Sequence, residues 1–123
     1  MSTSPEVNEA NLRELPTRQI VQDSLEFLPA ALIASMVGVR ETEQVHQWAA
    51  GILTPTPDTM DRLCFMLAQA LAIAAEESNA VATSWLTSAN THLENALPIA
   101  AIRASRFREV SDAVVVFLHG YAN

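Results

Sequence analysis

The stretch that decides the fold is residues 32–51, which read LIASMVGVRETEQVHQWAAG. Apolar residues at helical spacing lead up to Gly38, and a second helical pattern places Val45 and Trp48 three residues apart before a closing glycine. Glycine commonly ends helices because it adopts the left-handed backbone without a steric penalty. Ala34 is small enough for two helices to approach each other closely. The stretch therefore predicts two short helices joined by a tight turn and packed as in a helix-turn-helix.

Helical patterns continue on both sides of this stretch. Before it, a helix is expected from Thr17, a candidate N-cap, to Pro29, where the next helix starts. After it, Thr56 and Pro57 supply an N-cap and a first-turn proline for a long helix that is apolar on two faces and should lie between two packing modules. Shorter helices are expected over residues 81–86, from Pro98, and over residues 106–119.

The fold class that follows is all-α. The run 114–116 is all valine and also has strand propensity, but no other segment offers it a strand partner. We expect a flexible N-terminal arm over residues 1–16, a helix-turn-helix region over 17–77 and a C-terminal module of three helices over 78–123.

Composition places the chain among folded cytoplasmic proteins. Half of its 123 residues are hydrophobic, and no apolar stretch is long enough to cross a membrane. The only cysteine, Cys64, cannot form an intramolecular disulfide and is expected to fill the core. The net charge is −7, with seven arginines and no lysine. General attraction to nucleic acid is therefore absent, and any DNA contact must be local.

A helix-turn-helix suggests DNA as a partner, and the candidate contacts lie on and before its second helix. Gln44 and Gln47 are suited to adenine edges, and Thr42 to a phosphate or a thymine methyl. Arg40 is the strong phosphate ligand nearby, whereas Glu43 can accept only from cytosine and otherwise repels the backbone. We expect weak operator binding that depends on dimerisation or on a partner. The alternative is an ordinary three-helix core without a nucleic-acid role.

A second pattern occupies the C-terminal third. It consists of a short segment that ends Trp85-Leu86, an Asn-containing loop, a Pro-led segment that starts at Pro98, a basic turn and a last apolar helix. This order is similar to the toxin-binding domain of the Xre/MbcA/ParS antitoxin family, and residues 28–71 resemble the Xre-type DNA-binding fold that precedes it there. The resemblance covers about residues 17–118. Three features depart from the family pattern. One is Ser105, because many members have glycine in that turn. The others are Leu97 and the acidic second helix of the helix-turn-helix.

The resemblance implies a bacterial antitoxin that binds a RES-domain, NAD-degrading toxin, occludes its substrate pocket and regulates its own operon. A homodimer or a hetero-oligomer with the toxin is expected. Arginines on one short stretch and apolar residues beyond the main stripe of the last helix fit a protein interface. The candidate toxin-binding residues are Arg103, Arg106, Arg108, Val115, Val116, His119 and Tyr121. The alternative is a helix buried within the protein's own dimer.

Catalytic and metal chemistry is not indicated. His46, His92 and His119 lie on different elements without ligand neighbours, and there is no glycine-rich phosphate loop. We expect no enzyme activity, no cofactor and no catalytic or metal residues. Two alternatives to the antitoxin stay open: a stand-alone helix-turn-helix regulator without a toxin partner, and a small adaptor without DNA contact.

Overall fold

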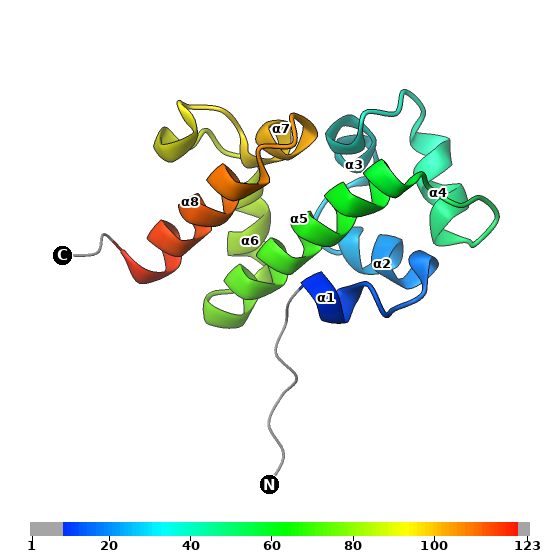
Figure 1. Cartoon of the computed structure of the whole chain (residues 1–123), viewed down its shortest axis with the longest axis horizontal. Coiled ribbons are helices and arrows are strands. Elements are labelled where there is room, and N and C mark those ends of the chain that lie inside the picture. The colour runs from blue at the N-terminus through cyan, green and yellow to red at the C-terminus, as the bar shows by residue number, and fades with distance from the viewer. Residues whose placement is uncertain (1–8, 121–123) are drawn as a thin grey trace, which may run out of the picture.

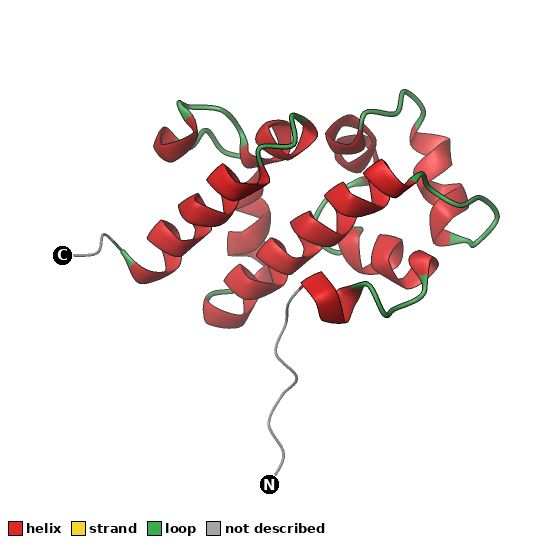
Figure 2. Cartoon of the chain, in the orientation of Figure 1, coloured by secondary structure: helices red, strands yellow, loops and turns green. Residues whose placement is uncertain are grey.

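The computed structural model describes residues 9–120, and this part of the chain is helical without a strand (Figure 2). The helices are α1 (Glu9–Leu12), α2 (Thr17–Ser24), α3 (Ala30–Val37), α4 (Thr42–Ala49), α5 (Pro57–Glu76), α6 (Asn79–Leu86), the 3-10 helix η1 (Thr91–Leu93), α7 (Pro98–Arg103) and α8 (Phe107–His119). The predicted all-α fold is confirmed. The valine run 114–116 is part of α8.

The long helix α5 forms the centre of the molecule. Figure 1 shows it crossing the middle, with α1 to α4 on one side and α6 and α8 on the other. Thr56 is its N-cap, with Oγ1 accepting a hydrogen bond from the Thr59 amide at 3.2 Å, and Pro57 is in the first turn. The side chains buried along its length include Leu63, Cys64, Phe65, Met66, Leu67, Ala68, Ala70 and Ile73. The prediction that this helix lies between two packing modules, with Cys64 in the core, is confirmed.

In the first module α2 and α3 pack against α5, and α4 packs against α2 and α3. Val45 and Trp48 of α4 are buried, as are Val21 of α2 and Ile33 of α3. The backbone starts α2 differently from the prediction, because Pro16 is the N-cap and Thr17 is already helical. Thr17 therefore does not cap this helix. Pro29 likewise lies just before the first residue of α3.

The second module contains α6, η1, α7 and α8. Ser78 caps α6, with Oγ accepting from the Val81 amide at 3.1 Å, and Pro98 opens α7 as predicted. The rings of Phe65 in α5 and Phe107 in α8 stack with centroids 4.5 Å apart. The buried side chains of the second module include Leu86, Leu93, Ile102 and Val110. Because α7 also packs against α3, the two modules share one continuous core.

The expected flexible arm is partly folded. Residues 9–12 form α1, and Leu12 is buried against the core. The Arg13 guanidinium, just after α1, donates to Asp61 of α5 at 2.9 Å and to Glu9 at 2.8 Å. Leu12 and the two ion pairs of Arg13 connect this turn to the rest of the fold, so residues 9–12 form a helix within the segment that was expected to be an arm. Residues 1–8 and 121–123 are outside the described part.

Candidate macromolecule-binding surfaces

The turn between α3 and α4 has the geometry that the sequence suggests. Gly38 has φ +85°, and its amide donates to the Ala34 and Ser35 carbonyls at 3.0 and 3.3 Å. The next amide, of Val39, also donates to Ala34 at 3.0 Å. The bonds from Gly38 to Ser35 and from Val39 to Ala34 together form a Schellman cap. Such a cap satisfies carbonyls at the helix end and reverses the chain sharply. The predicted left-handed end of the helix at Gly38 is confirmed.

The candidate DNA-contact residues lie on the outer side of this turn and of α4. Because Val45 and Trp48 hold the inner face of α4 in the core, the opposite face is turned to solvent. Arg40, Thr42 and Glu43 are exposed, and Gln44 and Gln47 are half-buried. The fold thus places all five on one short segment, with Glu43 still beside the potential phosphate ligands.

The three C-terminal arginines do not form one cluster. Arg103 is on α7 and lies at the α3–α4 turn, where its Nε is 3.9 Å from the position that a Cβ would take at Gly38. Arg106 lies after the α7–α8 turn, and Arg108 is exposed on the first turn of α8. The α7–α8 turn reverses the chain between Arg103 and the other two. Neighbours in sequence therefore serve different surfaces, which a pattern of residue types does not reveal.

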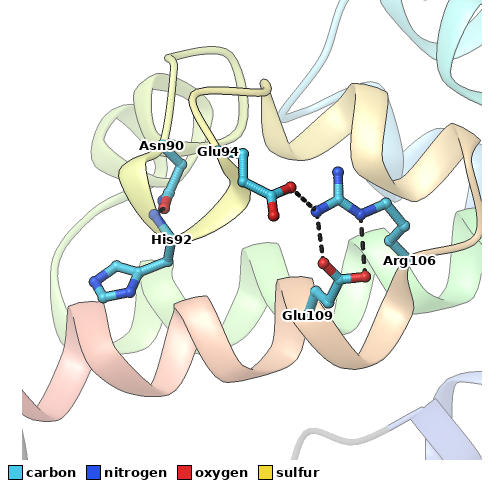
Figure 3. Close-up of polar contacts among 5 residues, drawn as sticks. All are labelled: Asn90, His92, Glu94, Arg106 and Glu109. Carbon is cyan, nitrogen blue, oxygen red and sulfur yellow. Dashed lines mark hydrogen bonds and ion pairs between the residues drawn. The ribbon is translucent and has the colours of Figure 1, made fainter.

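Arg106 is held by two carboxylates (Figure 3). Its guanidinium donates to Glu94 at 2.9 Å from Nη2 and to Glu109 at 3.0 Å from Nε. The hydrogen bond from Arg106 lowers the pKa of Glu109, and the same bond raises the pKa of Arg106. These contacts tie the loop before α7 to the start of α8. Arg106 therefore has a structural task in addition to any contact with a partner.

The apolar candidates lie near the end of α8. Val115 is 54% exposed, Val116 is half-buried and His119 is exposed, whereas Tyr121 lies outside the described residues. Phe117, which continues the apolar pattern of this helix, is 44% exposed. Figure 1 shows this end of α8 lying at one extremity of the molecule, beyond most of the bundle that would bury it.

A shallow apolar groove adjoins these residues. It runs between α6 and α8 and continues past the loop after α6. Trp85 forms its floor, and the Phe117 ring lies 6.2 Å from the Trp85 ring between centroids at an interplanar angle of 48°. The other lining residues include Val81, Ser84, Ala89, Asn90, Ala113 and Val116. Sequence reasoning missed this groove, because its lining comes from α6, the loop after it and α8, and the spacing of residues does not show which elements meet.

The remaining chemistry of the described part is sparse. Over residues 9–120 no three His, Cys, Asp or Glu side chains converge in a way that could hold a metal ion. No helix in the same range is long and apolar enough to pass through a bilayer. Cys64 is a buried free thiol, and desolvation raises its pKa. The surfaces with visible binding potential are therefore the α3–α4 turn and the end of α8.

No family model, no curated protein and no solved structure matches this chain.

Proposed function

We propose that the protein is an antitoxin that binds a RES-domain, NAD-degrading toxin through its C-terminal module and binds operator DNA through the α3–α4 region. The observation that carries the proposal is the apolar surface formed by the exposed ring of Phe117 and the groove over Trp85 that it lines. Apolar area of this kind is costly to leave in water, and it marks surfaces that a partner covers. It lies on the module whose residue order is similar to that of the toxin-binding domain.

The α7–α8 turn adds independent support for that similarity. Ser105, where many family members have glycine, has φ +61°. L-residues rarely adopt this region, and glycine does so without strain. The backbone here therefore has the shape that explains glycine in the family, although this chain carries serine.

The DNA-binding part is supported by the exposed face of α4 and the tight turn before it. Arg40 and Thr42 can contact phosphates, and Gln44 and Gln47 are suited to base edges. The charge of −7 keeps this binding weak for a single chain. A dimer or a toxin complex, which presents two such helices, strengthens it.

The test is protection of cells against a co-expressed RES-domain toxin encoded beside this chain. Phe117→Glu places a charge in the proposed surface, on a side chain that lines the groove and is already exposed. Ile52→Glu is the matched control, because Ile52 is 69% exposed, lies after α4 and changes the net charge by the same unit. Circular dichroism checks that both variants stay helical. We expect the intact chain and Ile52→Glu to protect, and Phe117→Glu to fail.

Two outcomes would count against the proposal. Equal protection by both variants would show that the end of α8 is not the inhibitory surface. Absence of protection by the intact chain would remove the antitoxin function and leave the stand-alone regulator, for which operator binding without any toxin is the criterion.

A further inference from the structure

Arg103 comes from the C-terminal module but lies on the surface of the first. Its side chain lines one hollow together with Ser35, Gly38, Arg40 and Thr42. The packing of α7 on α3 brings it there, and the guanidinium Nε lies 3.9 Å from the position that a Cβ would take at Gly38. The result is two arginines, 63 positions apart in the sequence, beside one tight turn.

The chemistry of this hollow is that of an oxyanion site. Guanidinium groups only donate hydrogen bonds, and the hydroxyls of Ser35 and Thr42 can donate as well. Among residues 9–120 no carboxylate forms an ion pair with Arg40 or Arg103, whereas Arg13 and Arg106 are both paired. Two guanidinium groups that line one hollow without a carboxylate in its lining are suited to bind one anion together.

We propose that Arg103 and Arg40 bind one phosphate group, and that this phosphate belongs to a DNA backbone. The inference rests on the DNA-binding part of the proposed function and extends it to a residue outside the helix-turn-helix region. Thr42 lines the same hollow and is the first residue of α4, so a phosphate here lies at the start of the helix that would enter the groove. Phosphate contacts at that place fix the register of such a helix. The hollow is open to solvent, which suits a backbone phosphate better than an enclosed small anion.

The assignment changes the role of Arg103. Sequence reasoning placed it on the toxin-binding surface with Arg106 and Arg108. The position beside Gly38 makes it a backbone contact instead, and the two modules then bind DNA as one unit. Arg40 is no longer the only phosphate ligand at this turn.

The test compares Arg103→Ala and Arg40→Ala with Arg108→Ala, which removes the same charge from an exposed arginine of α8. Fluorescence anisotropy measures the binding of the full chain to its own promoter duplex and to a random duplex at several salt concentrations. We expect Arg103→Ala to weaken both complexes about tenfold or more, since a charge-assisted hydrogen bond is lost. The slope of log K against log salt should fall by about 0.9. Arg108→Ala should leave slope and affinity close to those of the intact chain.

A double-mutant cycle adds a readout that general electrostatics does not give. If Arg40 and Arg103 hold the same phosphate, the loss in the double variant is smaller than the product of the two single losses. If the intact chain binds DNA and Arg103→Ala behaves like Arg108→Ala, the site is wrong while the DNA-binding function stands. If the intact chain binds neither duplex at low salt, the DNA-binding function fails and the backbone assignment fails with it. A shift of the Gly38 amide resonance by inorganic phosphate alone, without DNA binding, would assign the site to a free anion.

Discussion

Replacing Ser105 by glycine should make the protein more stable, which is unusual for a change that removes a side chain. Ser105 has φ +61° in the α7–α8 turn. The left-handed region costs an L-residue about 1 to 2 kcal/mol, while glycine loses about 0.5 to 1 kcal/mol more backbone entropy on folding. The hydrogen bond that Ser105 Oγ accepts from Arg62 is 3.4 Å long and exposed, so its loss matters little. The free energy of unfolding should therefore rise by about 0.5 to 1 kcal/mol in the glycine variant.

The matched control is Ser105→Ala, which removes the same hydroxyl but keeps the Cβ and therefore the strain. Urea unfolding followed by circular dichroism should give midpoints in the order glycine, then serine, then alanine. In thermal unfolding, Ser105→Gly should raise the Tm by roughly 2 to 5 °C. A glycine variant no more stable than the alanine variant would refute the reasoning, since it would mean that the turn has no left-handed strain to relieve.

Four further experiments test other parts of the fold and of the proposed DNA-binding surface. Trp48→Ala should cost about 3 to 5 kcal/mol in urea unfolding, because Trp48 is only 4% exposed. Cys64 should resist iodoacetamide until the protein unfolds, because it is buried and its pKa is raised; rapid labelling of the folded protein would contradict this. Arg106 lowers the pKa of Glu109 in the folded protein. The ion pair therefore stabilises the fold at pH values above the pKa that Glu109 has in the unfolded chain. This stabilisation is lost as the pH falls through the pKa that Glu109 has in the folded protein. The Tm advantage of the intact protein over Glu109→Gln at neutral pH should therefore shrink as the pH falls below the ordinary glutamate pKa and through the lowered pKa of Glu109. Glu43→Ala should strengthen binding to a random duplex in a mobility shift, since a like charge is removed.

The helices were predictable because their ends depend on local chemistry. Gly38 supplies a left-handed backbone, Thr56 and Pro57 define a helix start, and Ser78 caps the next one. Each of these devices acts within four residues and is visible in sequence. The start of α2 was not predictable in the same way, because proline and threonine compete for adjacent roles there. The folding of residues 9–12 onto α5 depends on Leu12, which with Leu15 makes an apolar pattern too short to predict a helix.

The sites were less predictable because they depend on which helices meet. The candidate DNA contacts of α4 could be assigned to its exposed face from the sequence, because the buried face of a helix defines the opposite, exposed face. The path of α7 decides that Arg103 joins Arg40, and no spacing rule contains that information. Phe117 shares the spacing of the core residues of α8, yet it is exposed because the helix extends past its neighbours. Periodicity describes a face of a helix but not where the bundle stops.

The most direct test of the proposed function is NAD hydrolysis by the purified RES-domain enzyme encoded beside this chain, measured with increasing amounts of the full chain. An antitoxin that covers the substrate pocket should bring hydrolysis to the background rate near one equivalent, and Phe117→Glu should require a large excess. Undiminished hydrolysis in the presence of excess intact chain, or the absence of any such enzyme beside it, would contradict the account.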